Sequence, residues 1–60
     1  MTHPDARALA LINLEYAAED GRPEVLAQYA RNARRHGVKV GVIAGVYGMR
    51  VEVVEEMTKP

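Results

Sequence analysis

The chain has 60 residues, no cysteine, and eight basic residues against eight acidic ones, so its formal net charge at pH 7 is zero. A chain of this length forms one small domain over residues 1–60, and neither disulfides nor a thiolate zinc site can stabilise it. Association with a second copy is the remaining way to stabilise so small a core, and we therefore expect a homodimer.

Composition also argues against several classes of function. The two histidines, His3 and His36, are too few and too far apart in the sequence for a metal site, and we expect no cofactor. The N-terminus lacks a basic segment leading into an apolar run, as a signal peptide would have. The longest apolar run, Val40 to Met49, is too short to span a bilayer. We therefore expect a cytoplasmic bacterial or phage protein without membrane contact.

The first predicted helix covers about residues 5–19, with Pro4 suited to its first turn. It is apolar on two nearly opposite sides, which carry Leu9, Ile12 and Tyr16 on the one and Leu11, Leu14 and Ala18 on the other. Both sides need a cover. We expect the domain's own core to cover one, and a second subunit to cover the side with Leu11 and Leu14. The alternative is that Leu11 and Leu14 are simply exposed.

The second predicted helix covers about residues 23–36, between Gly21, which ends the first helix, and Gly37, which serves as its own C-cap. Its apolar stripe consists of Val25, Leu26, Tyr29, Ala30 and Ala33. The opposite face is polar and carries Gln28, Arg31, Arg34 and Arg35. From Arg31 to Lys39 the chain has no acidic residue, so a local basic patch exists although the total charge is zero.

Residues 40–58 are predicted to form two short helices joined by a turn at Gly48. Apolar residues at helical spacing favour helices, whereas the β-branched residues and the alternation in Val38–Val42 favour strands. The predicted fold is therefore all-α, a small three-to-four-helix bundle with a C-terminal helix-turn-helix. The alternative is α+β, with two helices followed by a hairpin that pairs Val38–Ala44 with Tyr47–Glu55.

Small and apolar residues follow a distinctive spacing in the second half of the chain: Ala30, Ala33, Gly37, Val38, Ile43, Ala44, Gly48, Met49, Val54 and Met57. From Ala27 to Met57 the chain thereby resembles the helix-turn-helix domains of small bacterial and phage regulators. In that family the helix after the glycine turn enters the major groove of DNA. The resemblance implies a dimeric DNA-binding transcriptional regulator that binds duplex DNA.

Carried onto this sequence, the resemblance places two sets of residues on DNA. The base-reading helix would present Arg50, Val51, Glu52, Glu55 and Glu56 outward. The DNA backbone would be contacted by Arg31, Arg34, Arg35, Lys39 and also Arg50. Three glutamates beside a polyanion, and Val42 and Val46 expected on the surface, also suit a protein contact. The alternative function is therefore a helix-turn-helix scaffold that binds a protein, for example a phage-encoded modulator of a host protein.

We do not expect an enzyme. The sequence shows no Ser–His–acid set, no paired-carboxylate cleft and no phosphate-binding glycine loop, because no Lys-Ser or Lys-Thr follows its glycines. The three tyrosines lie on apolar stripes, where a role in the core is the simpler explanation.

Overall fold

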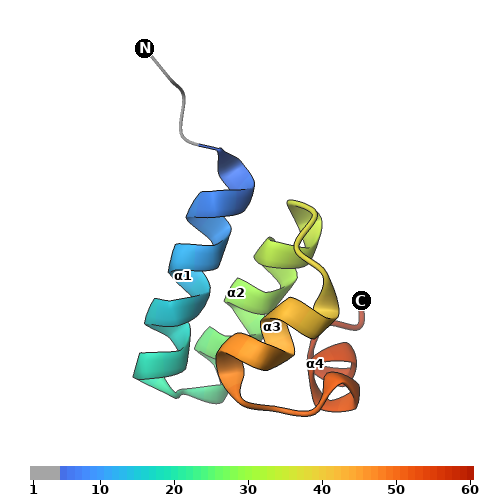
Figure 1. The fold of residues 1–60 in the computed structure, drawn as a ribbon. Helices are drawn as coiled ribbons and strands as arrows, with labels where there is room; N and C mark the ends of the chain where they lie inside the picture. Colours follow the sequence, from blue (N-terminus) through green and yellow to red (C-terminus); the bar gives the residue numbers. More distant parts are fainter. Residues whose placement is uncertain (1–4) are drawn as a thin grey trace.

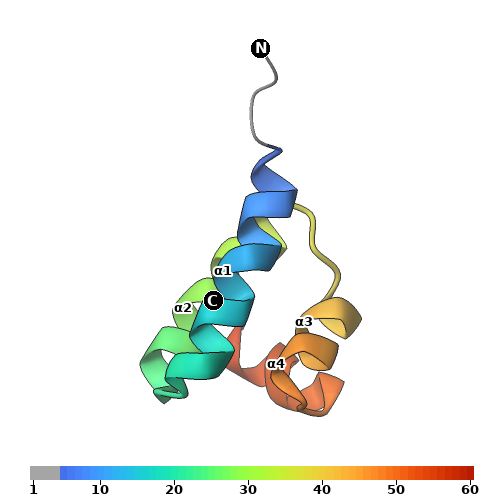
Figure 2. The same ribbon diagram turned by 60° about the vertical axis from the view of Figure 1, so that its left-hand side comes forward.

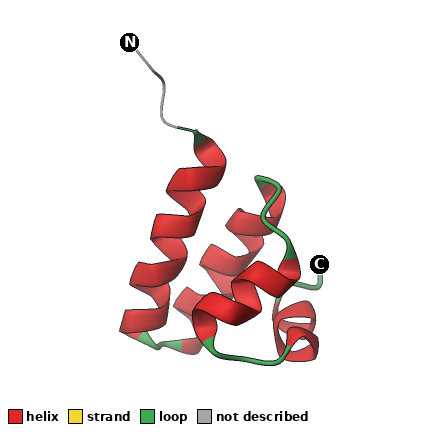
Figure 3. Ribbon diagram, in the orientation of Figure 1, coloured by secondary structure: helices red, strands yellow, loops and turns green. Residues whose placement is uncertain are grey.

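The computed structural model describes residues 5–60, which form four helices: α1 (Ala6–Asp20), α2 (Pro23–Arg35), α3 (Val40–Tyr47) and α4 (Val51–Met57). No residue in this part of the chain lies in a strand, as Figure 3 shows. The all-α prediction is confirmed, and the alternative hairpin over Val38–Glu55 is wrong. His3 and Pro4 lie outside the described residues.

α1 and α2 run antiparallel, side by side, as the two views in Figure 1 and Figure 2 show. Asp5 begins α1, and its side chain accepts a hydrogen bond from the backbone N–H of Arg7 at 3.1 Å. Gly21 ends the helix with φ 78°, as predicted, and its N–H donates to the carbonyl of Ala17. The turn carries an ion pair between Asp20 and Arg22, and the Arg22 side-chain hydrogen bond lowers the pKa of Asp20.

The core-facing side of α1 is its stripe of Ala10, Leu14 and Ala17, all of which are buried. α1 packs mainly on α2, where Ala30 and Ala33 are also fully buried. Small side chains on both helices allow the backbones to approach closely, and Leu14 fills the space that remains. The more apolar-looking side, with Leu9, Ile12 and Tyr16, is exposed.

The remaining core comes from the C-terminal half. The buried cluster continues through Val38, Ile43, Ala44 and Val54. Val38 follows Gly37, whose φ of 90° turns the chain away from α2. The N–H of Val38 donates to the carbonyl of Ala33 at 2.9 Å, so the buried connection has a backbone partner.

α3 and α4 are the two short helices predicted in the C-terminal part of the chain, and they are joined by a turn at Gly48. Gly48 ends α3 in the left-handed region with φ 67°, and the N–H of Met49 donates to the carbonyl of Ala44 at 3.0 Å. α3 contacts the other three helices, whereas α4 contacts α2 and α3 only. α1 and α4 therefore lie on opposite sides of the molecule (Figure 1).

One side-chain hydrogen bond ties α3 to the start of α2. The hydroxyl of Tyr47 donates to the carbonyl oxygen of Leu26 at 2.8 Å. Partial burial raises the pKa of Tyr47 from 10.0 to about 12, because the charged phenolate is poorly solvated there.

Replacing Tyr47 by phenylalanine should lower the free energy of unfolding by about 1 kcal/mol, the usual contribution of one such hydrogen bond. The replacement should also remove part of the pH dependence of the free energy of unfolding. Between pH 10 and about 12 the unfolded chain loses the Tyr47 proton while the folded chain keeps it, so stability falls as pH rises. Urea unfolding of both proteins across this range measures the difference.

Tyr16→Phe is the matched control, since Tyr16 is exposed on α1 and makes no hydrogen bond in residues 5–60. The control should keep the stability of the parent chain and its decline above pH 10. An equal loss in both variants would contradict the role given to Tyr47.

None of the helices in residues 5–60 is both long enough and apolar enough to cross a membrane.

Candidate nucleic-acid interface

The basic residues predicted to contact phosphate lie on α2 and at the starts of the next two helices. Arg31, Arg34 and Arg35 belong to the last turns of α2 and are exposed. Lys39 precedes α3, and Arg50 precedes α4, each with extended backbone angles and an exposed side chain. These five cations therefore lie on, or just before, three consecutive helices: α2, α3 and α4.

Arg34 has a structural partner that the sequence did not suggest. Its Nη1 donates a hydrogen bond of 2.8 Å to Oγ1 of Thr58, just after α4. That hydroxyl in turn donates to the carbonyl of Val54 at 2.8 Å. Arg34 therefore joins the end of α2 to the end of α4. Its guanidinium has a hydrogen-bond partner within the fold, whereas those of Arg31 and Arg35 have none in the described residues.

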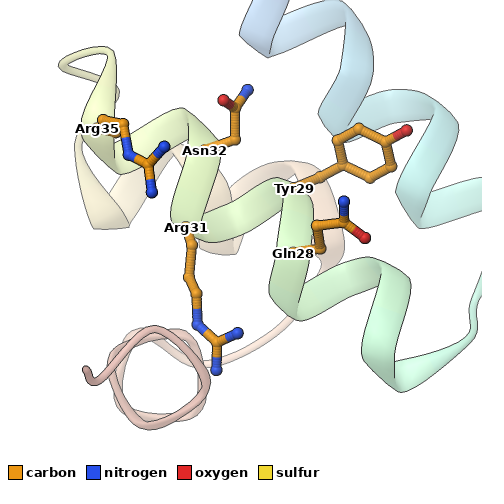
Figure 4. Close-up of a pocket in the computed structure, with 5 residues that line it drawn as sticks. All are labelled: Gln28, Tyr29, Arg31, Asn32 and Arg35. Atoms are coloured by element: carbon orange, nitrogen blue, oxygen red, sulfur yellow. The ribbon is translucent and has the colours of Figure 1, made fainter.

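Arg31 and Arg35 line an open hollow of about 410 Å³ on the exposed side of α2, together with Gln28, Tyr29 and Asn32. Figure 4 shows the five side chains spreading from the helix, with Arg31 directed to the side where α4 lies. The positions 28, 31, 32 and 35 recur at helical spacing, so they share one face. We call this face, Gln28, Arg31, Asn32 and Arg35, the α2 polar face.

Gln28 and Asn32 were not among the predicted site residues, although the signal for them was present. Gln28 was placed on the polar side of the helix, and Asn32 lies next to it at the same helical spacing. Both amides can donate and accept hydrogen bonds, which suits contacts to phosphate, sugar or base edges. A search restricted to charged residues misses them.

The ion pairs within residues 5–60 join Asp20 to Arg22 and Glu56 to Lys59. Neither involves Arg31, Arg35, Lys39 or Arg50, so these cations have no carboxylate partner in the described part of the chain. A cation without an internal partner can bind an external anion without first breaking an ion pair. These four residues form the available basic set.

α4 itself presents an acidic surface. Glu52, Glu55 and Glu56 are exposed on its seven residues, as predicted, and Val51 and Val53 are partly exposed beside them. Glu56 is paired with Lys59, whereas Glu52 and Glu55 have no ion-pair partner within residues 5–60. The contact of Glu52 with a DNA base stays a prediction.

Of the four residues predicted to form a partner surface, one is exposed in the structure. Val42 is 43% exposed, but Leu14 is fully buried, and Leu11 and Val46 pack partly against the core. The placement of Leu14 on a dimer surface was wrong because the side of α1 that carries it faces α2. Val46 is covered because α3 is short and contacts all three other helices.

Comparisons with protein-family models, with curated proteins and with solved structures found no match for this chain.

Proposed function

We propose that this chain is a small DNA-binding regulator that contacts the backbone of duplex DNA through the α2 polar face, Lys39 and Arg50. The observation that carries the proposal is a set of four exposed cations without carboxylate partners in residues 5–60, two of which line one hollow on α2 while the others precede α3 and α4. Two amide side chains lie among them on the α2 polar face. Arginine, lysine and amide groups are the usual donors to phosphate.

The proposal gives α2 more of the contact than the family resemblance does. α4 is short and carries three glutamates, which a polyanion repels. Glu24 is exposed one turn before Gln28, so the basic surface is confined to the C-terminal half of α2. DNA would therefore lie mainly across the C-terminal half of α2 and the start of α3, with non-specific phosphate contacts supplying most of the affinity.

The double variant Arg31→Ala/Arg35→Ala should weaken binding to duplex DNA about tenfold at low salt, and it should reduce the slope of log affinity against log salt by about 2. The reason is the loss of two phosphate contacts, each of which releases about one counterion. Fluorescence anisotropy with a labelled random duplex over a salt series measures both quantities.

Arg22→Ala is the control, because Arg22 is exposed just before α2, at the far end of that helix from Arg31 and Arg35. It should change the affinity by less than about twofold. An absence of binding by the parent chain at micromolar concentration and low salt would remove the proposal. An equal weakening by Arg22→Ala would show that the cations act only through total charge.

A second candidate function is a protein-binding module. The exposed valines Val42, Val51 and Val53 favour it, since the last two lie beside the α4 glutamates in an apolar and acidic surface. This function predicts no DNA binding by the parent chain in the same salt series, and therefore no effect of the Arg31/Arg35 replacement.

A further inference from the structure

The outward side of α1 carries the three most exposed large apolar side chains of the described residues. Leu9, Ile12 and Tyr16 are 49%, 50% and 67% exposed, and they recur at helical spacing over two turns. Ile12 and Tyr16 also line an open surface groove with Glu15 and Glu19. We call Leu9, Ile12, Glu15, Tyr16 and Glu19 the α1 outer face.

The charges beside this apolar stripe are all negative. Asp5, at the start of α1, falls on the same side by helical spacing as Glu15 and Glu19, whereas Arg7 falls on the far side. Neither Glu15 nor Glu19 is in an ion pair within residues 5–60. An apolar stripe with an acidic margin is therefore available on α1, and it favours a partner with an apolar stripe and a basic margin.

A second copy of this chain does not supply that partner. Two α1 helices crossing antiparallel at Ile12 would bring Asp5 of one copy opposite Glu19 of the other, and a parallel pair would bring Glu19 opposite Glu19. Both arrangements place like charges together at the margin of the contact, which costs affinity. The acidic margin thus argues against a homodimer through the α1 outer face, which is not the side with Leu11 and Leu14 where a second subunit was expected.

The other surfaces of a second copy fit no better. The α2 polar face is basic, but Tyr29 is the one apolar side chain in the hollow that this face lines, and that residue is half-buried. The exposed valines of α4 lie among glutamates. In the part of the chain that the structure describes, no surface combines a broad apolar stripe with cations.

We propose that the α1 outer face binds an amphipathic helix of another protein whose apolar stripe is bordered by lysine or arginine. Leu9, Ile12 and Tyr16 would pack on the apolar side chains of that helix, and Glu15 and Glu19 would pair with its cations. Helices that pack in this way meet along i, i+3 and i+4 positions, which the three apolar residues and the two glutamates supply. The α1 outer face lies roughly opposite the buried stripe of Ala10, Leu14 and Ala17 that packs on α2, so this contact does not use the α2 polar face.

The test uses two designed helical peptides of about 18 residues, each with leucine on one side, differing only in lysine or glutamate along the margins. The whole chain should bind the lysine peptide, measured by fluorescence anisotropy. NMR amide shifts should change along α1 and not on α4. Glu15→Gln/Glu19→Gln should weaken the binding about tenfold at low salt, through the loss of two charge pairs.

Glu52→Gln/Glu55→Gln on α4 is the matched control, since it removes the same two charges from the opposite side of the molecule, and it should leave the affinity unchanged. Equal binding of both peptides, equal weakening by both variants, shifts confined to α4, or no binding at millimolar peptide would each overturn the proposal. So would a dimer in sedimentation that Ile12→Glu dissociates, because that result would assign the α1 outer face to a second copy. The DNA salt series is independent of all these outcomes.

Discussion

Replacing Leu14 by alanine is expected to lower the free energy of unfolding by about 3 kcal/mol, since the variant loses a fully buried side chain and leaves a cavity. Leu14 is among the largest side chains in this core that are fully buried, and its neighbours Ala10 and Ala17 are small. They cannot move far enough to fill the space. In a domain of 60 residues a loss of this size is a large part of the total stability.

Leu9→Ala is the control, because the same atoms are removed from the same helix at a position that is half exposed. We expect it to cost less than about 1 kcal/mol. Urea unfolding followed by circular dichroism compares the two variants, and the parent chain sets the baseline. Equal losses would mean that α1 is turned the other way, with Leu9 rather than Leu14 in the core.

Alanine at Gly48 should destabilise the fold by about 1–2 kcal/mol, the cost of holding a residue with a Cβ in the left-handed region. A Cβ at Gly48 would meet no atom within 4 Å, so backbone strain at φ 67° is the cause and crowding is not. The same replacement at Gly45 should have the opposite sign. Gly45 lies inside α3 with ordinary helical angles and open space around it, so alanine there should stabilise the fold by up to about 1 kcal/mol.

These two glycines make a matched pair, three residues apart and both exposed. In thermal unfolding, the midpoint temperature of Gly45→Ala should therefore lie above that of the parent chain, and the midpoint of Gly48→Ala should lie below it. Two shifts of the same sign would contradict the turn at Gly48 that separates α3 from α4.

Much of the fold could be predicted from the sequence, because local signals agreed with one another. Gly21 and Gly48 were placed at helix ends, and both adopt positive φ there. On α2 the apolar stripe and the polar side were each predicted correctly, since an amphipathic helix with arginines on one side has one stable orientation. The competing strand signal in Val38–Val42 failed because buried helix packing outweighs β-propensity.

The orientation of α1 could not be read from hydrophobicity. Two sides of this helix carry large apolar residues, and the choice between them depends on the shape of α2. α2 presents alanines, so the side of α1 that carries Ala10 and Ala17 packs closest. This packing buries Leu14 fully and Leu11 partly, and it leaves Leu9, Ile12 and Tyr16 exposed.

The candidate interface could be predicted only in part, because some of its features depend on how the helices pack. Arg31, Arg35, Lys39 and Arg50 could be found because charge is visible in a sequence. The bond from Arg34 to Thr58 spans 24 positions, so only the packing of α4 on α2 brings its two ends together. Gln28 and Asn32 are uncharged, so they could be identified only from their positions on the polar side of the second helix.

The placement of α1 and α4 on opposite sides of the molecule gives this neutral chain an internal separation of charge. Acidic residues predominate on α1 and α4, while the cations are concentrated at the end of α2. A polyanion therefore exerts little net force on the whole chain at long range, but it exerts a torque that turns the end of α2 towards it. Orientation would then precede contact, and the rate of productive encounter would exceed what a net charge of zero suggests.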